Sequence, residues 1–344
     1  MKRILVWLVP DRFILVLIAT IALASVLPVR GSDVALANLL SSAAVFVIFL
    51  LHGIRLPRAE VIDGLKDWRT QGAIALFVFG VMTLAGLALW RLTSGSLPAM
   101  VALGFLYIGV LPTTVQSATT YCSLARGAVA VSVVASALDN LAAVIVTPTL
   151  FALLAGTAGG VSLGASLALR VGAILLLPFF IGQLIQRWAR PWALRHAALV
   201  KRIDQGAIAL AVYVAFSAAV VQGIWSKLDG GALGVLALGV GVMLLVGFGG
   251  AWATGRLVSD RLDVRTAVLF SGAHKSIAVG APLAALMFPR DAAGMVLLPI
   301  LAYHLAQLVI SAWIAPPLAR RNEAACLQGS AVLSNYNTPE PERL

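Results

Sequence analysis

The sequence predicts an all-α polytopic membrane protein with ten transmembrane helices. Of its 344 residues, 60% are hydrophobic and 11% are charged, and the mean hydropathy is +0.97. Soluble domains are about half apolar and about a quarter charged, so this chain carries more apolar side chains than a water-soluble core can bury. Apolar runs of the ~20 residues needed to cross a bilayer also recur along the whole chain.

The ten predicted spans are separated mostly by short connections. The first has a competing interpretation as a signal peptide, because Lys2 and Arg3 precede an apolar run. Pro10-Asp11-Arg12 interrupts that pattern, so we expect the segment to be retained. The chain becomes polar after the last span, and we expect a disordered tail from Asn322. The spans are residues 13–28, 34–54, 72–90, 98–124, 129–154, 166–187, 206–225, 232–255, 266–288 and 294–318.

The basic residues predict the orientation of these spans. With the N-terminus in the cytoplasm, 19 of the 25 lysines and arginines lie on the cytoplasmic side and five on the other, while Lys275 lies within a span. This bias is the positive-inside pattern, here of a cell inner-membrane protein with both termini in the cytoplasm. The net charge of +11 is therefore explained by topology and does not indicate a nucleic-acid partner. The expected partners are lipid and a small solute, and the sequence does not define an oligomeric state.

Two halves of five spans enter the membrane from opposite sides, which predicts an inverted repeat of residues 1–155 and 156–321 before a polar tail at 322–344. Aligning Pro148 with Pro316 supports this, because polar residues of spans five and ten then fall on one helical face at steps of three and four. Interhelical hydrogen bonding would explain the serines and the glutamine equally well, whereas a carboxylate within the membrane marks a functional site. The two trios are Ser132, Ser136, Asp139 and His304, Gln307, Ser311.

Spans four and nine are interrupted at corresponding places in the two halves. Span four contains GVLPTTVQSATT, in which Pro112 removes a backbone donor, and span nine contains SGAHKSIAVGAP. Paired interruptions of this kind mark the binding site of a secondary transporter. We therefore expect non-helical backbone around residues 111–114 and 272–275, where the two spans cross near the bilayer midplane. Simple proline kinks are the alternative, but they leave the polar residues after Pro112 without a role.

Lys275 needs its own explanation, because charging a lysine in hydrocarbon costs roughly 3 kcal/mol. It lies about ten residues into span nine, and Asp139 about ten into span five, so each is ~15 Å of helix from a membrane surface. We expect both side chains to face the protein interior, near each other or a water-filled cavity. The ammonium would then replace a bound cation, acting on an anionic solute as a fixed charge or switching with a proton. A static ion pair is the alternative.

The segments LPTTVQSA and ASALDNLAAVIVTPT resemble the fourth and fifth helices of the bile acid:sodium symporter family, and HKS followed by G-x-P resembles one branch of it. The resemblance extends over all ten spans in order. It implies a core domain and a panel domain related by inverted repeats, with helices four and nine unwound where they cross. It also implies secondary transport of a small, anionic organic solute by alternating access, without catalysis or an organic cofactor, and with sodium as a candidate coupling ion.

In the sodium-coupled members of that family, side chains of the crossing helices and of helix five bind two sodium ions. The positions carried over from them are Gln116, Ser117, Ser132 and Ser136. This chain departs from the pattern in span nine, where Phe270 stands in place of an acidic residue and His274 and Lys275 in place of two amides; ALFVFGVM of span three also lacks a glutamine. One sodium site is thus expected to be incomplete and the other absent, which leaves sodium and proton coupling both open.

These observations combine into one predicted site for the substrate and the ion. A membrane hydrolase using Ser276 with His274 or His304 is a competing function, but residues two apart point away from each other on a helix, and no nucleophile motif surrounds the serine. A non-transporting regulator of calcium handling is a second competitor, for which the sequence shows no recognisable domain. The predicted site is Thr113, Thr114, Gln116, Ser117, Ser132, Ser136, Asp139, Asn140, Ser271, His274, Lys275, Ser276, His304 and Gln307.

The predicted topology is testable with reporter fusions. A reporter that works only in the cytoplasm should be active when fused after Arg343, because an even number of spans returns the chain to the side on which it starts. Alkaline phosphatase fused at the same position is the control and should be silent, since it folds only outside the cytoplasm. An active phosphatase with a silent cytoplasmic reporter would overturn the ten-span topology.

Overall fold

The computed structural model describes residues 12–55, 67–156, 177–226 and 228–336. Within these ranges the chain is helical apart from turns, short irregular connections and one isolated bridge between Thr113 and Lys275. The first half contains α2 (Arg12–Val26), α3 (Asp33–Arg55), α5 (Trp68–Leu76), η1 (Phe77–Val81), α6 (Met82–Thr93), α7 (Ala99–Val110), α8 (Val115–Leu124) and α9 (Val129–Ala155). The second half contains α11 (Leu177–Arg195), α12 (Ala197–Val221), η4 (Ile224–Ser226), α13 (Gly230–Leu245), η5 (Val246–Gly250), α14 (Ala251–Val258), α15 (Leu262–Ala273), α16 (Ile277–Met287) and α17 (Arg290–Tyr336).

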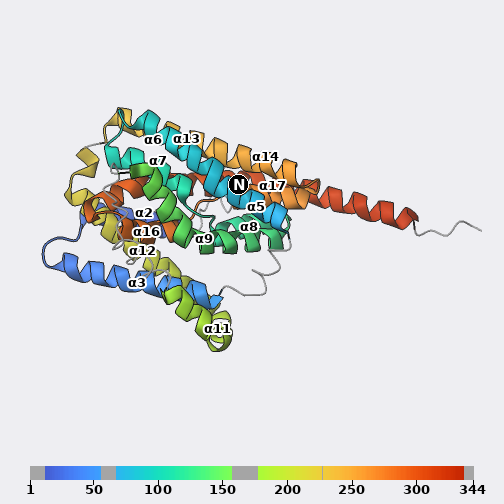
Figure 1. Cartoon of the computed structure of the whole chain (residues 1–344), viewed down its shortest axis with the longest axis horizontal. Coiled ribbons are helices and arrows are strands. Elements are labelled where there is room, and N and C mark those ends of the chain that lie inside the picture. Colours follow the sequence, from blue (N-terminus) through green and yellow to red (C-terminus); the bar gives the residue numbers. More distant parts are fainter. Residues whose placement is uncertain (1–11, 56–66, 157–176, 227, 337–344) are drawn as a thin grey trace, which may run out of the picture.

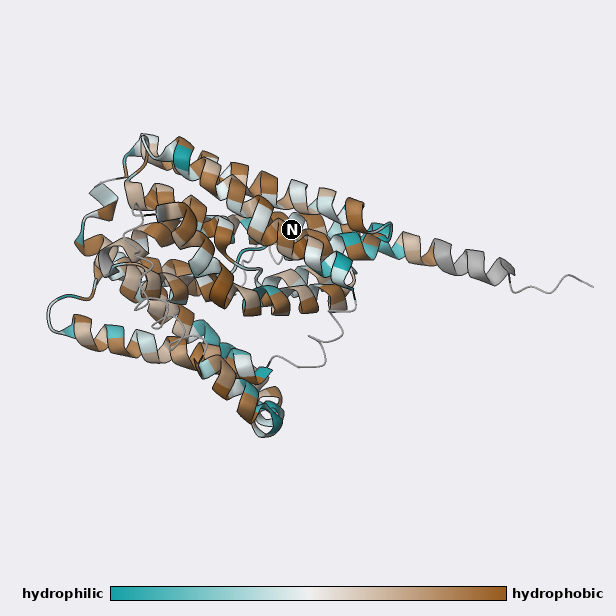
Figure 2. Ribbon diagram, viewed as in Figure 1, coloured by the Kyte–Doolittle hydropathy of each residue, from teal (hydrophilic) through white to brown (hydrophobic). Residues whose placement is uncertain are grey.

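Six of the described helical segments are long and apolar enough to cross a membrane, and α7, α16 and the main part of α2 are shorter apolar helices. Hydrophobic residues predominate along the length of the molecule (Figure 2), and many large apolar side chains of these helices are exposed. Leu76 and Leu245, for example, are 71% and 76% exposed. Such surfaces suit lipid rather than water. Half of the span predicted at 166–187 lies outside the described residues, so the count of ten remains a prediction.

The helices fall into two groups (Figure 1). α2, α3, α11 and α12 pack on one another, and we call them the panel group. The helices from α5 to α9 and from α13 to α17 form the second group, which we call the core group. The panel group meets the core group mainly where α12 packs on α16 and α17. A glycine allows this close approach, since a Cβ at Gly294 of α17 would lie 2.4 Å from the carbonyl oxygen of Ala215.

A π-helical turn interrupts one long helix in each half of the core group. The first is η1, between α5 and α6, and the second is η5, between α13 and α14. Both turns have a phenylalanine followed by glycine, in the sequences FVFGV and VGFGG. A π-turn shifts the backbone hydrogen bonds from i→i+4 to i→i+5, which leaves carbonyl oxygens near the turn available to other donors. In η1 this applies to Val78, whose carbonyl oxygen accepts a bond from another part of the chain.

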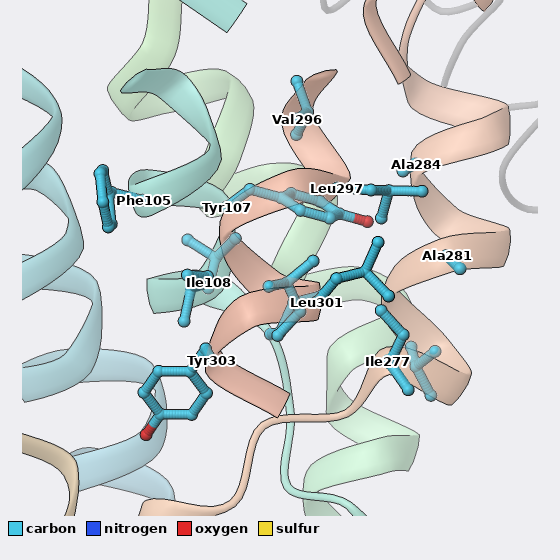
Figure 3. Close-up of a cluster of buried hydrophobic side chains, with 14 of the residues drawn as sticks. Phe105, Tyr107, Ile108, Ile277, Ala281, Ala284, Val296, Leu297, Leu301 and Tyr303 are labelled. Carbon is cyan, nitrogen blue, oxygen red and sulfur yellow. The ribbon is translucent and has the colours of Figure 1, made fainter. Parts of the chain in front are cut away.

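Two tyrosines anchor the interior of the core group. Figure 3 shows Tyr107 of α7 and Tyr303 of α17 among apolar side chains of α7, α16 and α17. Both residues are fully buried, so their hydroxyl groups need partners. Tyr107 donates to the carbonyl oxygen of Gly280 at 2.6 Å, and Tyr303 donates to that of Ala273 at 2.6 Å. These bonds tie the two parts of span nine to their neighbours.

The tail predicted to be disordered is instead helical as far as it is described. α17 continues without a break to Tyr336, and in Figure 1 it projects beyond the rest of the molecule. Asn322 is anchored by bonds from its side-chain amide to the carbonyl oxygen of Ala125 at 2.8 Å and to Thr266 Oγ1 at 3.1 Å. The sequence beyond it is rich in residues that favour helices, which polarity alone did not reveal. Residues 337–344 lie outside the described part of the chain.

The packing of α6 on α7 should depend on Gly86. A Cβ at this position would lie 2.4 Å from the carbonyl oxygen of Phe105, so the backbone of α7 must move to admit it. We expect Gly86→Ala to lower the free energy of unfolding by about 1–3 kcal/mol, measured by thermal unfolding in detergent. Gly241→Ala on α13 is the matched control, because its Cβ would meet no atom within 4 Å. Equal stability of the two variants would disprove the close packing.

Candidate functional site

The two interrupted spans meet at their breaks. α7 ends at Val110 and α8 begins at Val115, while α15 ends at Ala273 and α16 begins at Ile277. Thr113 and Lys275 form an antiparallel bridge, and the Ser276 N–H donates to the carbonyl oxygen of Pro112 at 3.0 Å. The four helix ends therefore converge on one short stretch of paired, extended backbone.

Local chemistry explains both breaks. Proline disfavours the helical conformation of the residue before it, and Leu111 is indeed extended, with φ −75° and ψ 149°. On the other strand, Ser276 ends the extended stretch by capping α16, because its hydroxyl accepts a bond from the Val279 N–H at 3.2 Å.

Lys275 is fully buried at this crossing, and its ammonium group is surrounded by main-chain carbonyl groups. Nζ lies 2.9 Å from the oxygen of Val78, 3.0 Å from that of Gly109 and 2.8 Å from that of Leu111. An ammonium has three donors, so all of them are satisfied. We call these three oxygens the carbonyl cage.

The cage uses carbonyl groups that helix geometry leaves unpaired. Gly109 and Leu111 lie at the C-terminal end of α7, where the last carbonyl groups of a helix have no partner within the helix. Val78 belongs to the π-turn η1. The partial negative charge at a helix C-terminus further favours a cation at this position. This arrangement shows how a lysine is accommodated here: each of its three hydrogens meets a main-chain carbonyl oxygen, and that of Gly109 also accepts a bond from Thr83 Oγ1 at 3.3 Å.

Asp139 of α9 lies near the cage but does not pair directly with Lys275. No bond shorter than 4.0 Å joins the ammonium to the carboxylate in the described residues. The carboxylate contacts Thr113 instead, whose hydroxyl is 3.0 Å from Asp139 Oδ2 and also bonds to the carbonyl oxygen of Ser271. The static ion pair considered as an alternative is therefore not formed in this conformation.

Hydroxyl and amide groups of α9 surround Asp139. The side-chain amide of Asn140 donates to the carbonyl oxygens of Thr113 at 2.8 Å and of Ser136 at 2.6 Å. Ser271 Oγ donates to Ser132 Oγ at 3.0 Å. The hydroxyl of Ser136 is buried and has no hydrogen-bond partner among the described residues. A buried hydroxyl without a partner is uncommon, and this one lies one helical turn from the carboxylate.

The backbone of Lys275 is held as tightly as its side chain. Gln307 accepts a bond from the Lys275 N–H at 2.8 Å and donates to the Lys275 carbonyl oxygen at 3.2 Å. Thr114 Oγ1 donates to the same carbonyl oxygen at 2.7 Å. Because an N–H can only donate, the atom of Gln307 that faces it is the amide oxygen. The Gln307 amide nitrogen then also donates to His304 Nδ1, at 2.8 Å.

His274 forms a separate network. Its ring nitrogens lie 2.8 Å from Ser117 Oγ and 2.7 Å from Ser311 Oγ. The ring packs against Tyr121, Phe248 and Phe270, and Phe270 is the residue that stands in place of an acid. An aromatic packing partner thus occupies a position where a carboxylate would be available to a cation.

The four residues carried over as a sodium site are distributed over different environments. Ser117 bonds to His274, Ser132 bonds to Ser271, Gln116 is exposed, and the Ser136 hydroxyl has no partner. In the described residues, no group of three or more histidine, cysteine, aspartate or glutamate side chains could hold a metal ion. The carbonyl cage is the arrangement most similar to a cation site, and Lys275 fills it.

A cavity of about 510 Å³ lies beside the crossing, between the core group and the panel group. Its core wall includes six of the predicted site residues, while Lys275 and Asp139 do not line it. The panel wall is apolar at Ile48, Phe49 and Phe179 and charged at Arg55, Arg190 and Asp204. The six site residues are Thr114, Gln116, Ser117, Asn140, Ser276 and His304.

Residues 11–320 match the model of the SBF-like CPA transporter family. The chain belongs to this family. An Escherichia coli protein named "Putative symporter YfeH" is 35% identical over 319 residues, which cover 91% of this chain and 94% of that protein. An uncharacterized protein of Pseudomonas aeruginosa is 34% identical over 316 residues, covering 92% and 95%. Sodium/bile acid cotransporter 7 of Rattus norvegicus is 23% identical over 290 residues, covering 81% and 82%.

Family membership confirms the resemblance and makes this chain an integral membrane transporter rather than an enzyme. The geometry agrees, because in the described network the Ser276 hydroxyl caps α16 while His274 and His304 bond to other residues. Sequence analysis missed the carbonyl cage, since main-chain oxygens leave no mark in a sequence. His52, which is not among the predicted site residues, also lines the cavity.

Removing the lysine side chain should create a sodium site. Lys275→Ala would remove a donor from three buried oxygens, of which that of Gly109 keeps its bond from Thr83. We expect a clear loss of thermal stability in detergent, at about 1–3 kcal/mol for each oxygen left unpaired. Sodium chloride should then raise the free energy of unfolding of this variant by up to ~2.7 kcal/mol when the sodium concentration is one hundred times the dissociation constant of the site. Choline chloride is the control salt, and Lys201→Ala, at an exposed lysine of α12, is the control variant. A Lys275→Ala protein whose melting ignores sodium would refute the cage as a cation site.

Proposed function

We propose that this protein is a secondary transporter that moves a small organic anion by alternating access, coupled to sodium or to protons. The observation that carries the proposal is the position of Lys275, buried at the crossing of two broken spans with its ammonium in a cage of three carbonyl oxygens. Broken helices that meet beside a cavity are the usual binding architecture of secondary transporters.

The repeat architecture belongs to the same proposal. Residues 1–155 and 156–321 would form two inverted five-span repeats, with a short cytoplasmic tail at 322–344, in the inner membrane and with both termini in the cytoplasm. Each half contains one helix with a π-turn followed by one broken span, in the same order. This recurrence supports a repeat, because two unrelated halves would have no reason to share both irregularities in sequence order.

The lysine would act as a tethered cation. Carbonyl oxygens at unwound helix ends bind sodium in coupled transporters, and an ammonium offers the same charge to the same kind of ligand. Relatives of this chain carry the names "Putative symporter" and "Sodium/bile acid cotransporter 7", which supports coupling to a cation. With the cage filled by Lys275, a mobile ion would bind elsewhere, and Asp139 with the unpartnered Ser136 hydroxyl offers the remaining place for a sodium ion or a proton.

A ligand screen followed by transport measurements tests the function. Purified protein is first melted against a panel of organic anions, with and without sodium and at two pH values, since a ligand of the folded state raises the melting temperature. The best ligand is then offered to proteoliposomes under an imposed sodium or proton gradient. We expect accumulation above equilibrium with one of the two gradients.

Lys275→Gln is the informative variant, and Lys201→Gln is its matched control. We expect Lys275→Gln to reach the membrane and to lose at least about tenfold in the accumulation rate, because a neutral amide cannot supply the charge that the cage binds. Accumulation by Lys275→Gln at the rate of the control would refute the tethered cation. The absence of any flux, for every anion and both gradients, would favour a non-transporting regulator of ion homeostasis.

A further inference from the structure

Lys275 cannot itself bind the negative charge of a solute in this conformation. Its three donors are used by the carbonyl cage, its side chain is fully buried, and it does not line the cavity. The polar groups on the core wall of the cavity are hydroxyl, amide and imidazole groups, among apolar side chains. A positive charge that meets an anionic solute must therefore come from the panel wall.

The panel wall carries a cluster of charged residues from three helices. Arg55 comes from α3, Arg190 from α11 and Asp204 from α12, and His52 of α3 lines the same cavity. With two guanidinium groups and one carboxylate, the cluster has an excess of positive charge even when His52 is neutral. Within a cavity whose walls are otherwise largely apolar, such an excess attracts anions more strongly than it would in open water.

The members of the cluster are not equivalent. Arg55 is paired, with Nη1 2.5 Å from Asp204 Oδ2. Arg190 is not: across the described ranges no carboxylate lies within 4.0 Å of its guanidinium group, and its Nε is buried without a hydrogen-bond partner. Leaving a buried guanidinium N–H unpaired is costly, so this donor points to a partner that the protein itself does not supply.

We propose that Arg190 is the residue that binds the acidic group of the transported solute. This deepens the proposed function and rests on it. A guanidinium presents parallel N–H donors that match two oxygens of one acidic group, which suits a carboxylate or sulfonate better than a halide. The aromatic and aliphatic panel residues would cover the apolar body of the solute. Thr114, Asn140 and Ser276 would bond to polar groups of the solute other than the acidic group.

The division of the cavity has a mechanical consequence. Arg190, which would bind the acidic group, belongs to the panel group. The other polar groups of the solute would lie against the broken spans of the core group. A bound solute would therefore touch both groups and link their movement. An isosteric neutral molecule would contact the core wall without engaging Arg190.

Binding of two matched probes tests the assignment without any transport. Naphthalene-2-sulfonate and naphthalene-2-sulfonamide share size and shape but differ in charge, and their affinities are measured by calorimetry on protein in lipid nanodiscs. We expect the wild-type protein to bind the sulfonate at least about tenfold more tightly than the sulfonamide, and Arg190→Gln to bind both alike. Arg187→Gln is the matched control: it removes the same charge from the same helix at an exposed position outside the cavity.

A thiol reporter covers the case in which Arg190→Gln is poorly folded. Gln116→Cys on the opposite wall, in a Cys326→Ser background, is modified with an anionic and a cationic methanethiosulfonate reagent, and Arg190→Lys is compared with Arg190→Gln. We expect the ratio of the anionic to the cationic modification rate to fall at least threefold in Arg190→Gln, which lacks the charge. The ratio should be unchanged in Arg190→Lys, which keeps it.

The proposal is overturned if wild-type protein shows no preference for the sulfonate, or if Arg190→Gln keeps both the preference and the rate ratio. These results are separate from those on transport. A protein that prefers the sulfonate through Arg190 but accumulates no anion would refute the transport function and leave the anion site standing.

Discussion

One interaction underlies the architecture of this transporter, namely the contact between the Lys275 ammonium and the carbonyl oxygens of Val78, Gly109 and Leu111. In a membrane every backbone polar group must find a partner within the protein, so a broken span is tolerated only where its freed groups are bonded. The lysine needs three acceptors, and the breaks and the π-turn supply three main-chain carbonyl oxygens. The buried lysine, the broken spans and the π-turn would each be unfavourable alone. Together they are tolerated, because the ammonium donates to the carbonyl oxygens that the other two provide.

The positive charges of the core group and of the panel group lie in different surroundings. The cation of the core group is enclosed and bonded to the main chain, while the cations of the panel group face the cavity beside apolar side chains. The first kind stabilises the crossing, and the second kind can meet a solute. Close packing at Gly294 of α17 and Ala215 of α12 joins the two groups on one side of this arrangement.

Much of this could be predicted from the sequence, and the limits have physical causes. Pro112 and the HKS segment indicated the two breaks, because proline and a buried lysine are rare within an apolar span and have few explanations there. The partners of Lys275 could not be predicted: any residue can provide a carbonyl group, and only the π-turn brings Val78 into place. Asp139 was an obvious candidate partner by charge, but its carboxylate bonds to Thr113 instead. The positions of Arg190 and Asp204 on the cavity wall could not be predicted either, since they depend on how α11 and α12 pack.

A charge that is part of the chain has an electrical consequence. A sodium ion bound in a carbonyl cage enters from one side and leaves on the other, and it contributes about 2.3 kcal/mol per 100 mV of membrane potential to the work of the cycle. The ammonium of Lys275 makes no such contribution, because whatever path it follows in one half of the cycle is reversed in the other. In the proposed cycle, this transporter would therefore carry one fewer net positive charge than a relative with a free ion in the same cage. Its ability to concentrate an anion would depend correspondingly less on membrane voltage and more on the concentration gradient of its remaining coupling ion.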